Sequence, residues 1–131
     1  DSMLKVQESE KRYRKLFESS GDAIFLLEAR GENAGNIISA NQAAADMHGY
    51  TVDELLKLNI IRDLDTPHTA DNAPLRLQRI LQGEWINEEA NHRKKDGTVF
   101  PVEISAGLLE FMGNQYILAY DRDITERKKA E

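Results

Sequence analysis

The spacing of apolar residues predicts an amphipathic helix at the amino-terminal end of the chain. The residues with helical spacing are Met3, Val6, Tyr13 and Phe17, and Glu10 interrupts the series. Side chains three or four residues apart share one face of a helix, so these apolar groups are expected to form a stripe. That stripe can cover the domain's own sheet or pack against the same helix of a second copy. The sequence leaves both arrangements open.

Apolar runs further along the chain predict five strands. Runs rich in β-branched and aromatic residues, bounded by glycine, asparagine or aspartate, are typical of strands. The segments that fit are 23–27, 37–40, 85–93, 98–111 and 116–120. The Asp-Gly and Gly-Asn pairs between the last three segments favour tight hairpin turns, so these strands are expected to pair antiparallel.

The region between the second and third strands has the pattern of short helices. Asn41 is placed to cap a helix over residues 42–48, and Thr51 is placed to cap another over residues 52–58. A longer helix is expected over residues 69–81. Successive hairpins leave no room for the crossovers of a parallel sheet. The predicted fold class is therefore α+β, a five-stranded antiparallel sheet with short helices on one face.

Composition and charge limit the function classes. The chain has 131 residues, 40% of them hydrophobic and 31% charged, which suits one globular domain without a membrane span. A net charge of -6 without a basic stripe argues against nucleic acid or an anionic membrane surface as the partner. The absence of cysteine suits a reducing compartment. We therefore expect a cytoplasmic domain without direct membrane contact.

The carboxy-terminal segment predicts a helix that leaves the domain. The strand over residues 116–120 runs into charged residues, and Thr125 is placed to cap a helix that begins at Glu126. The chain begins without methionine and stops inside this helix signal. We therefore expect a domain excised from a longer protein.

Several motifs together resemble the PAS family of sensory domains. They are Tyr13-x-x-Leu16-Phe17-Glu18 before Asp22-Ala23-Ile24, Asn41-x-Ala43-Ala44 with Gly49-Tyr50, Lys95-Asp96-Gly97-Thr98, and Asp123-Ile124-Thr125. The resemblance covers about residues 10 to 127. It implies a flanking dimerisation helix over residues 1–20, a PAS sensory domain over 21–124 and the start of an output helix over 125–131.

The resemblance also implies a function. PAS domains are sensory and dimerisation modules of multidomain signalling proteins, including two-component systems, so this fragment is expected to be non-catalytic itself. It would bind a small ligand or cofactor between sheet and helices and pass a conformational change to a covalently linked effector. A homodimer through the amino-terminal helix is expected. The alternative is a ligand-free interaction or relay domain with a filled core.

Candidate site residues follow from the predicted sheet and from the family motifs. The candidates for a ligand pocket are Ile24, Leu26, Asn41, Trp85, Asn91, His92, Ile104, Tyr116, Leu118 and Tyr120, and the expected signal junction is Asp123 with Thr125. For each aromatic side chain in this set, simple filling of the core is the favoured alternative. Which of these residues face a common cavity depends on strand register, which the sequence does not give.

The family's cofactors can be compared with individual positions. Light-oxygen-voltage relatives need a reactive cysteine, so the absence of cysteine excludes cysteinyl-flavin photochemistry. Trp85 together with Asn91 or His92 resembles flavin-binding redox members, so non-covalent flavin stays open. Haem-binding relatives carry an axial histidine where this chain has Asn72, so haem is not expected.

Metal binding and catalysis have little support in the sequence. The histidines His48, His68 and His92 are too scattered for a local metal-ligand motif. Neighbouring carboxylates such as Glu88 and Glu89 point to opposite faces of a strand. We expect neither a metal nor a catalytic residue.

Overall fold

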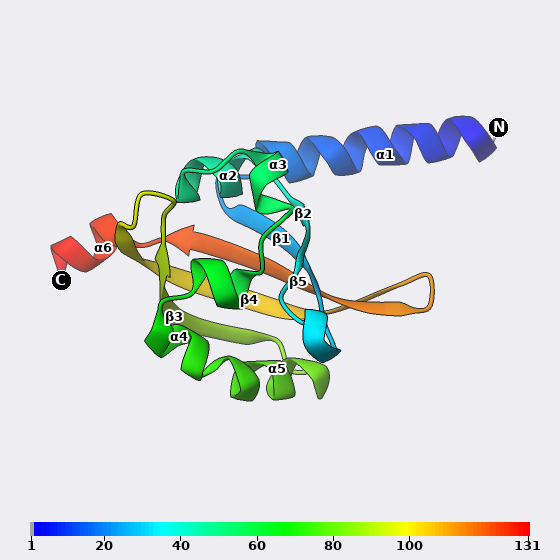
Figure 1. Ribbon diagram of the computed structural model, residues 1–131. Coiled ribbons are helices and arrows are strands. Elements are labelled where there is room, and N and C mark those ends of the chain that lie inside the picture. Colours follow the sequence, from blue (N-terminus) through cyan, green and yellow to red (C-terminus); the bar gives the residue numbers. More distant parts are fainter. Residues whose placement is uncertain (1) are drawn as a thin grey trace.

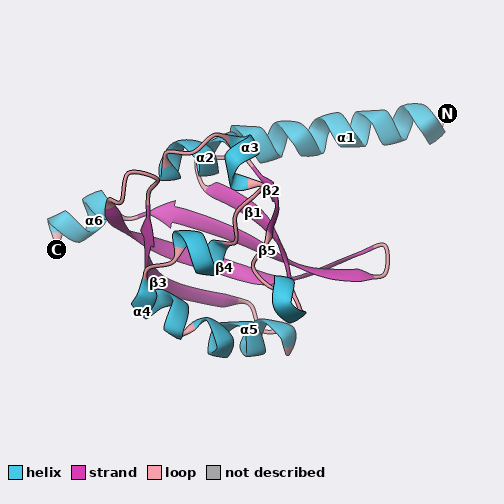
Figure 2. Cartoon of the chain, viewed as in Figure 1, coloured by secondary structure: helices cyan, strands magenta, loops and turns pink. Residues whose placement is uncertain are grey.

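The computed structural model describes residues 2–131 and has an α+β architecture (Figures 1 and 2). The helices and strands, with two short helical turns called η, are α1 (Ser2–Ser19), β1 (Ala23–Glu28), η1 (Gly31–Asn33), β2 (Ile37–Ala40), α2 (Gln42–His48), α3 (Val52–Leu55), η2 (Ile60–Leu64), α4 (Pro67–Asp71), α5 (Ala73–Leu81), β3 (Ile86–Arg93), β4 (Val99–Phe111), β5 (Asn114–Asp123) and α6 (Thr125–Ala130). The five strands form one antiparallel sheet, and the short helices α2 to α5 cover one of its faces. The predicted fold class is confirmed.

The last strand, β5, lies at the centre of the sheet. The strand order is β2-β1-β5-β4-β3, so β5 pairs with β1 on one side and with β4 on the other. The register places Asp121 opposite Ala23 of β1 and Ile104 of β4. Side chains of a strand alternate between the two faces of a sheet. This register therefore decides which side chains of the three central strands lie together.

The inner face of the sheet, which the helices cover, holds most of the core. Its apolar side chains from the central strands include Phe25, Leu27, Phe100, Val102, Ile104, Ala106, Ile117 and Ala119. Leu55 and Leu64 pack against them from the helical layer and are fully buried. Burying a side chain of this size contributes about 1.5–3 kcal/mol to folding. The alternation predicted for β4 is thus the alternation that builds the core.

The helical layer agrees with the capping signals in the sequence but differs in helix length. Asn41 caps α2, and Thr51 makes the capping box of α3. The expected single helix over residues 69–81 is two helices, α4 and α5. The break occurs at Asn72, where a continuous helix would need a hydrogen bond from residue 74 back to Ala70, and Pro74 has no N–H to donate. The helix expected over residues 52–58 ends at Leu55.

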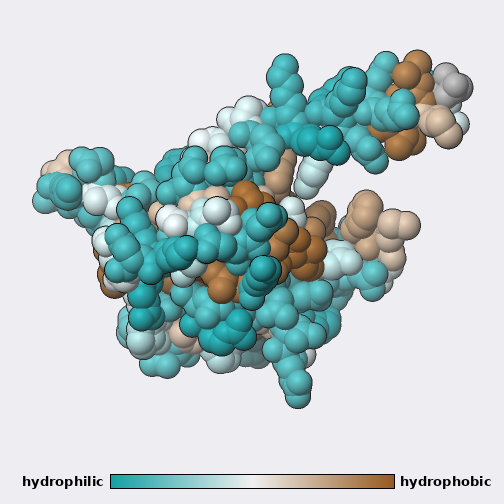
Figure 3. Space-filling view, turned by 45° about the horizontal axis from the view of Figure 1, so that its top comes forward, coloured by the Kyte–Doolittle hydropathy of each residue, from teal (hydrophilic) through white to brown (hydrophobic). Residues whose placement is uncertain are grey.

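Helix α1 extends away from the sheet instead of packing on it (Figure 1). No side chain between Ser2 and Ser19 is buried, and Met3 and Val6 are 72% and 58% exposed. Figure 3 shows the resulting apolar surface at the amino-terminal end of the helix. The apolar stripe of α1 therefore does not cover the chain's own sheet, which was one of the two arrangements that the sequence left open. Among residues 2–131, no helix has the length and apolarity to cross a bilayer.

The outer face of the sheet is also rich in apolar side chains. Trp85 lies across it, where its Nε1 donates a hydrogen bond to Ser105 Oγ at 2.7 Å. The Trp85 ring centroid is 6.3 Å from that of Tyr120. The ring lies so close to Gly107 that an added Cβ would stand 2.0 Å from it. Glycine at position 107 therefore lets the indole rest on the strand.

The Gly107→Ala substitution is expected to displace Trp85 from the outer face. The methyl group overlaps the ring, so the Trp85 bond to Ser105 breaks and the domain loses about 1–3 kcal/mol of stability. Because Trp85 is the only tryptophan, its fluorescence emission should shift to the red. Gly21→Ala is the control, since nothing lies within 4 Å of its added Cβ. Unchanged Trp85 emission in Gly107→Ala would contradict this packing.

Candidate functional site

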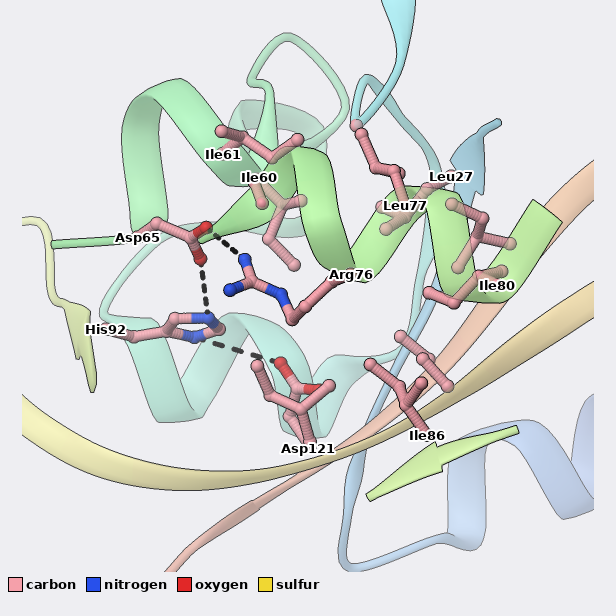
Figure 4. A pocket seen from close by; sticks show the side chains of 16 residues that line it. Leu27, Ile60, Ile61, Asp65, Arg76, Leu77, Ile80, Ile86, His92 and Asp121 are labelled. Carbon is pink, nitrogen blue, oxygen red and sulfur yellow. Dashed lines mark hydrogen bonds and ion pairs between the residues drawn. The ribbon is translucent and has the colours of Figure 1, made fainter. Parts of the chain in front are cut away.

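A cavity of about 60 Å³ lies between the inner face of the sheet and the helical layer (Figure 4). Most of its wall is apolar and comes from both layers, namely Leu27, Ile60, Ile61, Ala73, Leu77, Ile80, Ile86, Ile104, Ala106, Ile117 and Ala119. Four titratable or charged side chains, Asp65, Arg76, His92 and Asp121, line its remaining side. The cavity therefore has an apolar chamber and one polar wall.

Local structure explains how Asp65 reaches the polar wall. Asn59 begins the η2 turn, because its Oδ1 accepts hydrogen bonds from the N–H groups of Ile61 and Arg62 at 2.9 and 3.1 Å. The turn ends where the Asp65 N–H donates to Ile60 O at 2.8 Å. Asp65 then forms an isolated bridge with His92 of β3. This bridge holds the carboxylate of Asp65 beside the imidazole of His92.

Asp65 pairs with two buried cations or donors. Arg76, on the facing side of α5, reaches Asp65 Oδ2 with one terminal nitrogen at 3.0 Å. The other terminal nitrogen of Arg76 donates to Thr69 O at 2.9 Å. His92 Nε2 lies 3.2 Å from Asp65 Oδ1. Buried carboxylates need partners of this kind, because an unpaired charge in the interior is strongly unfavourable.

His92 also contacts a second buried imidazole, that of His48. The distance from His48 Nε2 to His92 Nδ1 is 2.9 Å, and His48 Nδ1 lies 2.9 Å from Ala44 O. Burial, followed by the positive charge of His92, lowers the pKa of His48 to about 4. At neutral pH His48 is therefore uncharged. Its single N–H donates to the Ala44 carbonyl, so its Nε2 accepts a hydrogen bond from His92.

Each ring nitrogen of His92 faces another polar group. Its Nδ1 lies 2.9 Å from His48 Nε2, whereas its Nε2, 3.2 Å from Asp65 Oδ1, makes no hydrogen bond among residues 2–131. A neutral imidazole has only one N–H, so it can donate to only one of these two neighbours. The polar wall therefore contains Arg76, two carboxylates and an imidazole whose Nε2 lacks a hydrogen-bond partner.

Asp121 is the least satisfied member of the polar wall. Its side chain is 0% exposed, and His92 Nδ1 lies 3.8 Å from its Oδ2, beyond hydrogen-bond distance. Among residues 2–131, neither carboxylate oxygen of Asp121 has a hydrogen-bond donor. Burial raises the pKa of Asp121 to about 6, and the charge of His92 opposes that rise. At neutral pH the group is thus mostly ionised but lacks hydrogen bonds.

Two of the residues predicted for the pocket, His92 and Ile104, line the cavity. The structure corrects the placement of most of the others. Ile24, Leu26, Trp85, Tyr116, Leu118 and Tyr120 do not line this cavity, and the five strand residues among them alternate with inner-face positions. In β1 and β5, the side chains that were expected to face the pocket lie on the outer face of the sheet. Both faces of these strands carry large apolar side chains, so apolarity alone did not show which face is covered by the helices. Asn41 has a structural role at the start of β1 and α2.

The positions considered for cofactors also separate in space. Asn91 is exposed and its side chain does not line the cavity, whereas the adjacent His92 does. Trp85 lies on the outer face, so it does not form one flavin contact surface with His92. Asn72, the position compared with a haem ligand, is exposed between α4 and α5. Of the four positions compared with flavin or haem contacts, Asn72, Trp85, Asn91 and His92, only His92 lines the cavity.

Sequence reasoning missed Asp65, Arg76 and Asp121, and it treated His48 and His92 as unrelated. The structure brings the two histidines into contact although 44 positions separate them. One signal was available, since Asp121 continues the alternation of the buried Ile117 and Ala119. Across residues 2–131, no three potential ligand side chains are arranged to hold a metal ion.

Comparison with known proteins now identifies the fold. The sequence profile of the PAS domain matches residues 11–85, more than half of the chain. The chain belongs to the PAS domain family. A PAS domain of an HTR-like protein from Haloarcula marismortui is similar with a TM-score of 0.80 and 28% identity, over 94% of this chain and 98% of that one. A domain of a Geobacter sulfurreducens sensor histidine kinase/response regulator has a TM-score of 0.74 and 33% identity, over 90% and 96%.

Two longer relatives are signalling proteins. A methyl sulfide methyltransferase-associated sensor of Methanosarcina acetivorans is 34% identical over 96% of this PAS domain. A sensor histidine kinase of Ectopseudomonas mendocina is 29% identical over 99% of it. The chain spans only 12% and 13% of the length of these proteins. This PAS domain is a sensory signalling domain of the type found in larger multidomain sensors.

The two buried groups with shifted pKa values predict opposite pH effects on stability. His48 has a lowered pKa, so its contribution is present above pH 6.5 and is lost as the pH falls through about 4. Asp121 has a raised pKa, so its contribution is present below pH 3.8 and is lost as the pH rises through about 6. In the unmodified domain these effects partly cancel between pH 4 and 6.

Variants separate the two effects when the free energy of unfolding is measured by urea titration at several pH values. Asp121→Asn leaves the His48 effect, so stability should rise by up to about 3 kcal/mol from pH 4 to 6.5. His48→Gln leaves the Asp121 effect, so stability should fall by a similar amount from pH 4 to 6. Identical pH profiles for both variants would contradict the assigned protonation states.

Proposed function

We propose that this PAS domain binds a small ligand in the cavity and relays the change to a carboxy-terminal effector through the Asp123-Ile124-Thr125 junction. One observation carries the proposal. Asp121 lines the cavity, and Asp123, two residues later on β5, holds the first turn of α6. The strand that senses the cavity is therefore also the strand that starts the exit helix. Both the ligand in the cavity and the effector after α6 are proposed.

The junction has a defined hydrogen-bond geometry. Asp123 Oδ1 accepts bonds from Thr125 N at 2.9 Å and from Thr125 Oγ1 at 2.5 Å. The cap predicted at Thr125 thus comes from Asp123, because Thr125 is already the first residue of α6. The Ile124 N–H donates to Pro101 O of β4 at 3.1 Å, and the Ile124 side chain is buried. Displacement of the end of β5 would therefore change the start of α6.

Ion pairs further along α6 tie the helix to the edge of the sheet. Arg127 lies 3.2 Å from Glu103 of β4, and Lys128 lies 2.5 Å from Glu89 of β3. Exposed pairs of this kind contribute little to stability, because water and salt screen them. Such weak contacts favour a helix that can change its angle without unfolding the domain. This supports α6 as an output element.

We further propose that the domain forms a homodimer through α1. Among residues 2–131 no side chain of α1 is buried, and the stripe positions Met3, Val6, Tyr13 and Phe17 follow the spacing of a coiled-coil seam. Two such helices would cover each other's stripe. In this proposal residues 1–20 form the dimerisation helix, residues 21–124 the sensory domain and residues 125–131 the start of the output helix.

The wider setting of the domain is also a proposal. The signalling relatives favour a covalently linked effector, such as a kinase domain, and a non-catalytic role for this PAS domain itself. The cysteine-free composition favours a cytoplasmic location. Native mass spectrometry and an absorption spectrum of the purified domain test for a bound ligand. A co-purified mass supports ligand sensing.

The second candidate function is a relay with no ligand. The observation that favours it is the size of the cavity, which is small beside pockets of about 300–1,000 Å³ that hold drug-sized molecules. In that case the domain passes on strain that reaches it through α1. Both candidates use the same junction, so they differ in the cavity and not at α6.

The Asp123→Ala substitution is expected to loosen α6 and leave the core intact. Loss of the carboxylate removes both bonds to Thr125 and destabilises the helix start by about 1 kcal/mol. Hydrogen exchange at the Lys128 amide, which donates to Ile124 O, should accelerate about fivefold. In the full-length protein the same variant should uncouple effector output from the signal.

Asp96→Ala is the matched control for this experiment. Asp96 Oδ1 accepts from the Thr98 N–H at 2.9 Å in the β3–β4 turn, so the control removes the same kind of bond elsewhere. Exchange at Lys128 should not change in this variant. Normal effector control in Asp123→Ala would sink the proposed junction.

The Val6→Glu substitution is expected to convert a dimer to a monomer. It puts a charge in the apolar stripe of α1, where two copies would meet. Light scattering after gel filtration reports the mass. Gln7→Glu, one position along, adds the same charge off the stripe and should leave the dimer intact. A monomer in the unmodified protein at high concentration would refute the proposed dimer.

A further inference from the structure

The polar wall of the cavity indicates the class of ligand, provided that the cavity is the sensing site proposed above. Asp121 is completely buried, lies on the cavity wall and has no hydrogen-bond donor among residues 2–131 (Figure 4). A buried carboxylate without donors is unfavourable, since it has lost its hydrogen bonds to water. A ligand that brings a donor to Asp121 would restore them.

The one permanent cation of the wall, Arg76, is already paired with Asp65. The closest group to Asp121 is the imidazole of His92, and His48, which contacts His92, is neutral at pH 7. An anionic ligand would add a charge beside two carboxylates. A cationic ligand would lose its hydration in a chamber that is mostly apolar. A neutral ligand with a hydrogen-bond donor meets the requirement of Asp121 without either cost.

The nitrogen atoms of the wall are directed at the wall's own acceptors. Each terminal nitrogen of Arg76 makes one such bond, to Asp65 or to Thr69. His92 uses Nδ1 for His48, and its Nε2 faces Asp65 without a hydrogen bond. A carboxylate ligand would find few donors here and would face two carboxylates. The unmet requirement is for a donor, and a hydroxyl group provides one without a charge.

The size and shape of the chamber limit the rest of the ligand. A volume of about 60 Å³ corresponds to roughly four to six water-sized atoms, taking about 10–15 Å³ for each. Six isoleucines, Ile60, Ile61, Ile80, Ile86, Ile104 and Ile117, contribute most of the bulky wall. Such a chamber suits a short, branched aliphatic chain.

We propose that the cavity binds a small neutral aliphatic alcohol whose hydroxyl donates a hydrogen bond to Asp121 and whose branched chain fills the isoleucine-lined chamber. The alcohol needs no hydrogen-bond donor from the polar wall, because its hydroxyl group acts as the donor. A ligand of this size is expected to bind in the millimolar range, because few atoms contribute to the affinity. Binding should order the end of β5 next to the Asp123 junction.

The test compares three probes of equal carbon skeleton by amide chemical shifts of the whole domain. Isobutanol carries the neutral donor, isobutylammonium adds a positive charge, and isobutyrate replaces the donor by a carboxylate. Each is titrated to about 50 mM at pH 7. Isobutanol should shift the amides of Ile80, His92 and Asp121 with a dissociation constant in the millimolar range, and the two ions should bind at least about tenfold more weakly.

Three variants examine the polar wall and the chamber separately. Asp121→Asn should weaken isobutanol binding about tenfold, since it removes the charge-assisted bond. Ile80→Phe should abolish binding by filling the chamber while leaving the polar wall in place. Asp46→Asn, an exposed site on α2, should bind as the unmodified domain does. Two independent variants keep the test valid if one of them folds poorly.

Each other outcome overturns the assignment in a distinct way. Tighter binding of isobutyrate or isobutylammonium at the same amides would overturn the neutral-donor class and still support sensing in the cavity. Equal binding of isobutanol to Asp121→Asn would overturn the role of Asp121. If none of the three probes shifts these amides, the cavity does not take this ligand, and the proposed relay then depends on the Asp123→Ala experiment alone.

Discussion

Strand β5 is hydrogen-bonded to a neighbour on each edge, and this fixes the face on which each of its side chains lies. Its pairing with β1 and β4 puts Asp121 on the inner face, under the helices. A one-residue slip would bring Asp121 to the outer face, but it would also move the buried Ile117 and Ala119 out of the core. The strand register that keeps Ile117 and Ala119 in the core therefore also keeps the carboxylate of Asp121 buried.

The helical layer supplies the groups that make this burial tolerable. Asp65 and Arg76 reach the wall from the η2 turn and from α5, and His92 joins them from an edge strand. Buried ion pairs recover little more than their desolvation cost, so stability alone does not account for such a cluster. Its members come from separate elements, and each holds its place only while the others do. The cluster therefore connects the sheet to the η2 turn and to α5 by polar contacts in addition to apolar packing.

The sequence predicted most of the fold, because the signals that define its elements are local. The helix over residues 42–48, the capping box at Thr51 and the alternation of β4 all appear in the structure. Large apolar side chains on both faces hid the parity of β1 and β5, so residues such as Tyr120 and Leu118 were assigned to the pocket although they lie opposite it. The polar wall was missed because it joins residues distant in sequence, and alternation alone does not show which carboxylate finds a partner.

Successive residues of β5 face opposite sides of the sheet, so this strand contacts both the outer face and the cavity. Tyr120 faces the outer side of the sheet beside Trp85, and the next residue, Asp121, faces the cavity. Two residues further on, Asp123 holds the start of α6. In the proposed relay, a small twist of β5 would move an outer-face aromatic ring, a cavity carboxylate and the exit helix together, because all three are attached to this one strand. A ligand at Asp121 would bias the helix by favouring one of two such twists, and the free energy available would be its differential affinity for the two states.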